Sequence, residues 1–199
     1  MGLAGFDFEK LNSQWLAAPQ HPINMAGNYG VGISRIVAGE KVWRCVGAYH
    51  LRPDQNRGRH NLFVDVLDER GIRVNGAVVN WQWASDAPIQ TKTLDKPANE
   101  PGCDIPIDKN VTIKAWVQTG GLLSDAVYNI HPRHADEPGP NGENWNSVGH
   151  HSFYICFQRQ ASGTIAPPID PPTQPDTLEA AWVEIRKLWA VVNEWQGGK

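Results

Sequence analysis

The stretch HNLFVDVLDERGIRVNGAVVNWQW, residues 60–83, contains two valine-rich runs on either side of a short polar turn. The turn, residues 68–71, ends in glycine, which is typical of the connection between two antiparallel strands. Valine and aromatic residues favour extended backbone, so residues 60–67 and 72–83 are predicted to be strands. The sequence therefore predicts a hairpin here, with its second strand bent at Gly76.

Other strand-like runs follow the same pattern, and turn signals separate them. They cover residues 42–51, 111–117, 126–130 and 151–159. Residues 153–157 are apolar at successive positions, which is typical of a strand with both faces buried. No helical pattern alternates with the strands, so an all-β fold is expected: a two-sheet β-sandwich, Ig-like or jelly-roll, rather than a barrel or an α/β fold. Prolines at 88, 97, 101 and 106 exclude a central strand from residues 84–109.

The overall composition limits the classes of function. The chain has 199 residues and a net charge of −3, and no strongly basic surface indicates a nucleic-acid partner. No apolar run is long enough to span a membrane. The first residues carry acids rather than bases, so no signal peptide is expected.

Three cysteines, Cys45, Cys103 and Cys156, have no metal-ligand spacing and are expected to be buried thiols. A Cys45–Cys156 bridge remains open, because Tyr154 stands two residues before Cys156, as in the tyrosine corner of an immunoglobulin domain.

Both ends of the chain differ from the strand-rich middle. Residues 1–40 are expected to be a docking arm with a short helix over Phe6, Phe8, Leu11, Trp15 and Leu16, ended by the prolines at 19 and 22. The strand-rich middle, residues 41–160, is expected to form the β-sandwich and to be a display domain. A proline-rich linker, residues 161–175, leads to a predicted amphipathic helix at residues 176–199, which Asp176 would cap.

The predicted terminal helix has apolar residues at alternating spacings of four and three, in two overlapping seams. These are Leu178, Trp182, Ile185, Leu188, Trp189, Val192 and Trp195. Such spacing is typical of coiled coils and predicts either contact with its own domain or self-association. Large aromatic residues favour a trimer over a tight dimer, so a homo-oligomer, preferably a trimer, is expected.

Three tryptophans are candidates for contact with sugars. Trp81 and Trp83 would lie on one face of a strand, and Trp145 lies in a polar loop. Exposed indole rings stack on the apolar faces of sugar rings, whereas buried ones belong to the core. Both interpretations remain open at this point.

The sequence contains no catalytic motif of a known enzyme class. The pairs Asp65–Asp68 and Asp104–Asp108 would serve glycoside hydrolysis only if folding placed them suitably; solvated acids in turns are the simpler interpretation. Histidines at 131, 134, 150 and 151 match no standard zinc spacing. No catalytic residue, metal ligand or cofactor is therefore predicted.

Residues 60–77 are similar to a hairpin motif of Ig-like and prealbumin-like sandwich modules. With residues 94–101 and 149–154, they resemble domains of tailed-bacteriophage virion proteins and of bacterial cell-wall proteins. The resemblance covers residues 42–160 and implies a non-enzymatic head decoration or fibre protein, located in the virion and bound to other virion proteins. The alternative is a carbohydrate-binding module that adheres to cell-surface glycans; a small cell-wall hydrolase has the least support.

Overall fold

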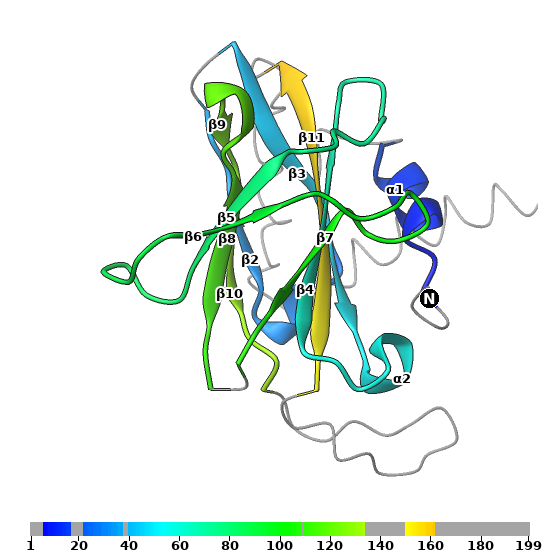
Figure 1. The fold of residues 1–199 in the computed structure, drawn as a ribbon, viewed down its shortest axis with the longest axis vertical. Coiled ribbons are helices and arrows are strands. Elements are labelled where there is room, and N and C mark those ends of the chain that lie inside the picture. Colours follow the sequence, from blue (N-terminus) through cyan, green and yellow to red (C-terminus); the bar gives the residue numbers. More distant parts are fainter. Residues whose placement is uncertain (1–5, 17–21, 38–39, 109, 134–149, 162–199) are drawn as a thin grey trace, which may run out of the picture. The chain divides into compact units, whose positions relative to one another are not determined.

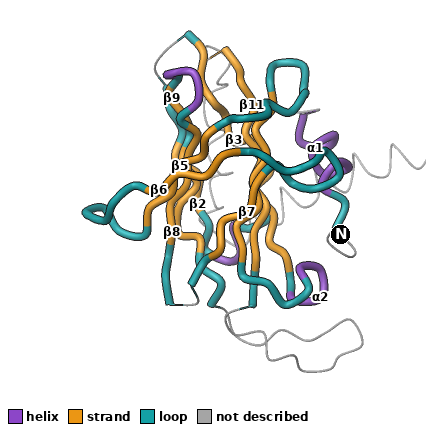
Figure 2. Tube along the Cα trace, viewed as in Figure 1, coloured by secondary structure: helices purple, strands orange, loops and turns teal. Residues whose placement is uncertain are grey.

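The computed structural model describes residues 6–16, 22–37, 40–108, 110–133 and 150–161. These residues form two β-sheets that face each other across one apolar core (Figure 1). The expected two-sheet, all-β architecture is confirmed. Figure 2 shows that loops and short helices connect the strands at both ends of the two layers.

The first sheet has six strands and mixed directions. Its order is β1 (Ile23–Asn24), β3 (Lys41–Leu51), β11 (Ser152–Ala161), β4 (Asn61–Leu67) and β7 (Cys103–Pro106), and β9 (Leu123–Ser124) also pairs with β3. β11 runs antiparallel to β3 and parallel to β4. It is thus a central strand, as its continuous apolar sequence predicted.

The second sheet has five strands, all paired antiparallel. Its order is β2 (Gly32–Ser34), β10 (Ala126–Ile130), β8 (Ile113–Val117), β5 (Val78–Gln82) and β6 (Gln90–Thr93). The sequence missed the two-residue strands β1 and β9, and also β6 and β7, which are both edge strands within the proline-containing region. Proline cannot donate a ladder hydrogen bond, so it is compatible only with such edge positions.

The helical elements of the described chain are short. They are α1 (Phe8–Leu16), α2 (Pro53–Asn56), η1 (Gly27–Tyr29) and η2 (Thr119–Gly121). None of the helices in the described ranges is long and apolar enough to cross a membrane.

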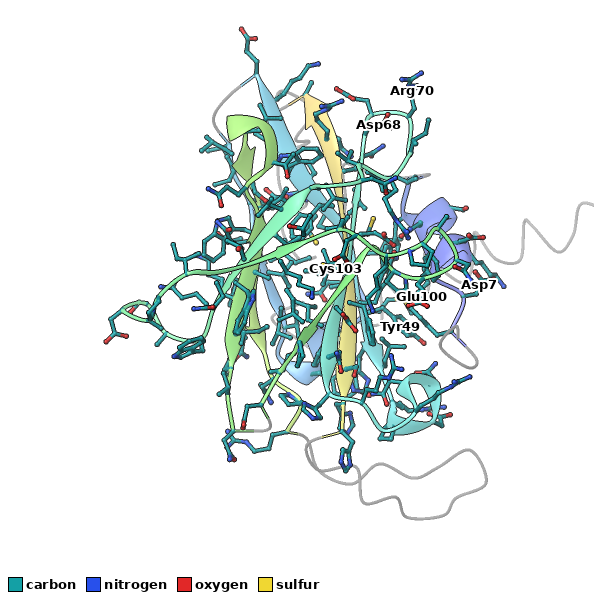
Figure 3. All side chains as sticks on the ribbon, viewed as in Figure 1. Asp7, Tyr49, Asp68, Arg70, Glu100 and Cys103 are labelled. Carbon is teal, nitrogen blue, oxygen red and sulfur yellow. The ribbon has the colours of Figure 1, made fainter. Side chains whose placement is uncertain are left out.

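The predicted hairpin is only partly correct. The turn at residues 68–71 forms: Asp68 N–H donates to Ile72 O at 2.8 Å, and Leu67 pairs with Arg73. Asp68 and Arg70 lie at this turn in Figure 3. Gly76, with a φ of +79°, then redirects the chain, and β5 joins the second sheet instead of pairing with β4. Glycine suits this bend because it adopts positive φ without steric cost.

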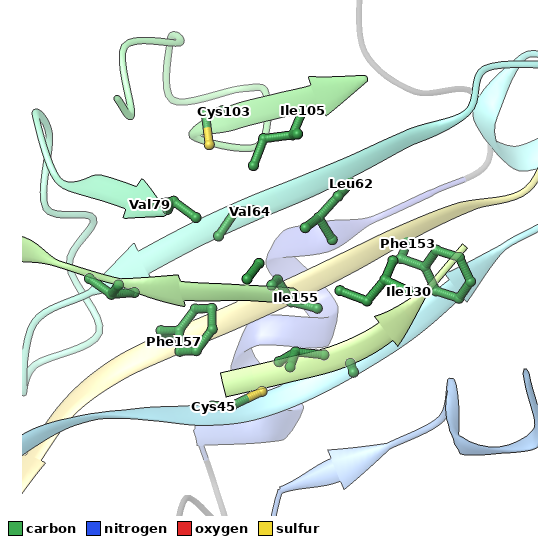
Figure 4. Packing of buried hydrophobic residues seen from close by; sticks show 14 of the residues in the cluster. Cys45, Leu62, Val64, Val79, Cys103, Ile105, Ile130, Phe153, Ile155 and Phe157 are labelled. Carbon is green, nitrogen blue, oxygen red and sulfur yellow. The ribbon is translucent and has the colours of Figure 1, made fainter. Parts of the chain in front are cut away.

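Side chains from both sheets fill the space between them. Figure 4 shows Phe153, Ile155 and Phe157 of β11 among residues of the neighbouring strands. Their partners across the core include Val79, Ile113, Ala115, Val117 and Val127, all buried. Burial of this apolar surface is the main force that holds the two sheets together.

The three cysteines are free and buried. Cys45 faces the core between the sheets, whereas Cys156 belongs to a second apolar cluster on the opposite face of the first sheet. A disulfide needs β-carbons directed toward each other, so these two cysteines do not form the bridge that the sequence left open. Tyr154 is also not a tyrosine corner, because its hydroxyl bonds to the side chain of Asp65.

The outer face of the first sheet is covered by α1, which lies on the side away from the second sheet (Figure 1). Trp15 is 1% exposed and stacks on Tyr154, and Phe6 stacks on Tyr49. The short helix predicted from the apolar spacing is confirmed. The outer face of β11 is apolar and would otherwise contact water, which explains why α1 packs on it.

The described part of residues 1–40 therefore belongs to the sandwich, and the expected boundary at residue 40 is wrong. β1 pairs with β3 and β2 pairs with β10. The buried carboxylate of Asp125 accepts hydrogen bonds from the backbone N–H of Ile36 at 2.9 Å and of Cys45 at 3.1 Å. These pairings are non-local, so hydrophobic spacing alone did not reveal them.

Most of the predicted linker, residues 161–175, and the predicted helix, residues 176–199, lie outside the described residues. Their seam residues, and Trp145 as well, remain sequence predictions.

Candidate functional site

Trp81 and Trp83 lie together at one end of the sandwich. Val79 of β5 is fully buried in the core, and Trp81, two residues later, points to the same face and is half-buried. Trp83 follows the end of β5 and is 44% exposed. The two ring centroids are 5.6 Å apart, with 53° between the ring planes. Strand alternation therefore brings both indoles to the open edge of the core.

An apolar cavity of about 310 Å³ lies against these two rings. Its other lining residues are Pro106, Ile107, Asp108, Val111 and Ile113. β7 of the first sheet ends at Pro106 and β8 of the second sheet begins at Ile113, so the cavity opens between the two sheets. Its size is at the lower end of the range for small-molecule sites, which are also mostly apolar with few polar groups.

A second cavity, of about 480 Å³, shares Trp83 and Ile113 with the first. Gln82, Ser85, Thr112, Lys114 and Asn129 supply its polar groups, and Ala84 completes the lining. Gln82 and Lys114 are directly opposite each other in the β5–β8 ladder. Trp83 thus lines both an apolar cavity and a second cavity that has several polar side chains in its wall. We refer to the residues lining these two cavities as the tryptophan end.

The polar groups of the second cavity are positioned by local bonds. The Gln82 side-chain amide donates to the backbone oxygens of Ala87 at 2.6 Å and Ser85 at 3.2 Å. Asn129 has a φ of +59° and donates through Nδ2 to Gly30 O at 2.7 Å. The loop after β5 and the end of β10 are therefore fixed at this edge.

A further cavity, of about 810 Å³, lies elsewhere, between α1 and the loops that follow β4 and β6. Asp65 lines it and is fully buried. Arg73 Nε lies 2.7 Å from Asp65 Oδ1, Gly102 N–H donates to the same oxygen at 2.9 Å, and the Tyr154 hydroxyl donates to Oδ2 at 2.7 Å. Burial raises the pKa of Asp65, and these three donors oppose that effect.

Both Asp65 oxygens are thus occupied by protein donors, and the Arg73 guanidinium also donates to Pro97 O and Glu100 O. This arrangement ties β4, β11 and the 97–102 loop together. The expectation that Asp65 is a solvated acid in a turn is wrong. Buried charge requires full pairing, and Asp65 has it, so we interpret the group as structural.

The other carboxylates named in the sequence are also held by local donors. Asp68 Oδ1 accepts from the backbone N–H of Arg70 and of Ile72, each at 2.9 Å. Asp104 pairs with Lys96 at 2.9 Å, and Asp108 accepts from Asn110 N–H at 2.9 Å. They serve as turn caps and surface ion pairs in this structure.

The histidines separate into different environments. His151 is buried, with Nδ1 2.5 Å from Nε2 of His50, whereas the adjacent His150 is exposed. Tyr29 stacks on His50 with 3.5 Å between ring centroids. Burial lowers the pKa of His131. In the ranges that the structure describes, no group of three or more His, Cys, Asp or Glu side chains could hold a metal ion.

Sequence reasoning identified Trp81 and Trp83 but missed the residues that surround them. Ile107 was interpreted only as part of a region without a central strand, and Val111, Ile113 and Lys114 only as parts of a strand. The meeting of β5, β7 and β8, which brings these residues to one site, is a tertiary feature. Trp145, the third candidate, lies outside the described residues.

No protein-family model, curated protein or solved structure matches this chain.

Proposed function

We propose that this chain is a non-enzymatic β-sandwich display domain of a tailed-phage virion, and that its tryptophan end contacts cell-surface glycans. The observation that supports glycan contact is Trp83, a large aromatic ring 44% exposed beside the apolar cavity. The virion role rests on the resemblance of residues 42–160 to Ig-like and prealbumin-like modules.

The chemistry of the tryptophan end suits a sugar. A sugar ring has apolar C–H faces and polar hydroxyl edges, so it stacks on an indole while its hydroxyls bond to amides and hydroxyls. Trp83 offers the ring, and Gln82, Ser85, Thr112 and Asn129 offer neutral polar groups beside it. Trp81 packs against the core, and its ring contacts the ring of Trp83. This contact restricts the movement of the exposed Trp83 indole.

A second interpretation treats Trp81 and Trp83 only as the edge of the core. The apolar lining of the smaller cavity suits that interpretation, and Trp81 does pack against the core. The exposure of Trp83 favours contact with a ligand, because a ring kept only for packing is generally more buried.

The test is glycan binding by Trp83→Ala, measured on a glycan array and by intrinsic tryptophan fluorescence. Tyr128→Ala is the matched control, since Tyr128 is 46% exposed and lines neither cavity of the tryptophan end. Loss of one stacking contact is worth about 1–3 kcal/mol, so Trp83→Ala should weaken binding by about fivefold to 150-fold, judged from aromatic stacking on nucleic-acid bases. Equal effects of both substitutions would contradict the role given to Trp83.

The virion proposal needs a separate test, because the predicted oligomerisation helix lies outside the described residues. The full chain is compared with a chain that ends at Gly163, by light scattering. A trimer that becomes a monomer on truncation supports assembly through residues 176–199. Equal masses would remove that role from the terminal segment while leaving the glycan proposal intact.

The proposal also includes the type of β-sandwich. We favour an Ig-like or jelly-roll module, because two sheets enclose the core. The parallel pair β4–β11 departs from the antiparallel sheets of immunoglobulin domains.

A further inference from the structure

The charge of the tryptophan end is asymmetric. Among the described residues that line the larger cavity, Lys114 is charged and the other polar side chains are neutral. The smaller cavity has Asp108 at its rim, whose Oδ1 already accepts a backbone N–H. A ligand that lies across Trp83 into the larger cavity therefore meets one cation and no carboxylate among the described lining residues.

Lys114 is exposed and available to a ligand. Its Nζ lies 5.4 Å from the centroid of the Trp116 ring, a cation–π contact that holds the ammonium above the outer face of the second sheet. Within the described part of the chain, no carboxylate forms a salt bridge with it. Several other cations of the described residues are paired with carboxylates, for example Lys96 with Asp104 and Arg159 with Glu69.

The positions of Lys114 and Trp83 match the two parts of an acidic sugar. Gln82 lies opposite Lys114 in the β5–β8 ladder, and Trp83 follows Gln82 in the chain. The indole of Trp83 and the side chain of Lys114 therefore line the same cavity. A sugar that stacks on Trp83 can direct an anionic substituent toward Lys114 Nζ. A hydrogen bond between charged groups is stronger than one between neutral groups.

We propose that the tryptophan end selects glycans whose sugars carry an anionic group, with Lys114 as the residue that determines this specificity. The inference rests on the proposed function, since it needs Trp83 to hold the sugar. Lys114 binds the charge, and Gln82, Ser85, Thr112 and Asn129 bind hydroxyls. Because Lys114 is exposed, solvent and salt reduce its contribution, and the expected preference is about threefold to tenfold.

The experiment uses the full chain and an array of neutral, uronic-acid and sulfated glycans. Each acidic glycan that binds is then titrated beside its carboxyl-esterified or desulfated form, so that the two ligands differ only in the anionic group. The carboxylate and sulfate arms identify which anion is preferred. Tighter binding of the acidic form, weakened by added salt, is the expected result.

Two variants separate specificity from binding itself. Lys114→Gln should lose the preference for the acidic form and keep its affinity for the neutral form. Lys10→Gln is the control: it removes the same charge from an exposed position on α1, on the opposite side of the sandwich, and should keep the preference. A preference that survives Lys114→Gln, or that both variants lose equally, would overturn the role of Lys114.

The outcomes also distinguish this inference from the proposed function. Equal affinity of the wild-type chain for acidic and neutral forms, with loss of both in Trp83→Ala, overturns the inference and leaves glycan binding standing. Absence of binding to every glycan on the array overturns both.

Discussion

The indole of Trp15 stacks on the phenol ring of Tyr154, with 5.6 Å between ring centroids and 18° between the ring planes. Trp15 belongs to α1 and Tyr154 to the central strand β11, so this pair joins the beginning of the described chain to its last described strand. Gly47 of the adjacent strand β3 lies beneath the indole. The contact explains why the outer face of the first sheet is apolar. Substitutions at Gly47 and at Tyr154 should therefore change the stability of the protein.

Gly47→Ala should destabilise the protein through a steric clash with Trp15. A β-carbon at Gly47 would lie 2.1 Å from Trp15 Cδ2, so the indole or the strand must move. Overpacking of this kind costs about 1–3 kcal/mol in unfolding free energy, measurable by denaturant titration. Gly27→Ala is the control, because its added carbon meets Asn24 at an ordinary 3.4 Å. In the background of Trp15→Ala, the effect of Gly47→Ala should become small; equal effects in both backgrounds would contradict the proposed clash.

Tyr154→Phe should destabilise the protein by about 1–3 kcal/mol, because it leaves a buried carboxylate oxygen of Asp65 without its donor. The lost hydrogen bond is 2.7 Å long, and the Asn12 side-chain amide, 2.8 Å from the same hydroxyl, also loses its partner. Tyr49→Phe is the comparison, since its hydroxyl accepts from Gln55 at 3.1 Å at a less buried position. Thermal and denaturant unfolding of the two variants should differ clearly, and similar stabilities would argue against a structural role for Asp65.

Glu69 should titrate with a pKa of about 2, well below its usual 4.5. The main cause is the hydrogen bond from Arg159, 2.8 Å away, and Lys41 at 3.2 Å adds to it. Because the folded pKa is lowered, the pair stabilises the fold above pH 4.5, and this contribution disappears as the pH falls through about 2. The side-chain carboxyl carbon followed by NMR gives the pKa directly. Arg159→Gln should move it back toward the usual value; an unchanged pKa would show that Arg159 is not the cause.

The three thiols should resist modification in the folded protein. Burial raises the pKa of Cys45 and of Cys103 to about 12 and that of Cys156 well above its usual value, so little thiolate exists at neutral pH. A thiol reagent at pH 8 should detect none of them before unfolding and all three in denaturant. Rapid reaction of the native protein, or fewer than three thiols after unfolding, would contradict the buried, unbridged state.

Local pattern was sufficient for several elements of this fold. Runs of valine, aromatic and other apolar residues located the strands that became β3, β4, β8, β10 and β11 close to their observed bounds, because such runs depend only on neighbouring residues. The apolar spacing near the amino end likewise predicted α1. The turn at residues 68–71 formed as expected, but Gly76 directed the next strand into the other sheet. A sequence reveals that a bend is permitted, whereas its direction depends on which sheet has space for the strand.

The sequence by itself determined where most of the central strands lie and that Trp81 and Trp83 share a face. Only the tertiary structure decided that α1 covers the first sheet, that Asp65 is buried among donors, and that Lys114 lines the same cavity as Trp83. The physical reason is range: strand periodicity comes from backbone geometry within a few residues, whereas cavities and buried ion pairs arise where segments far apart in the chain pack together.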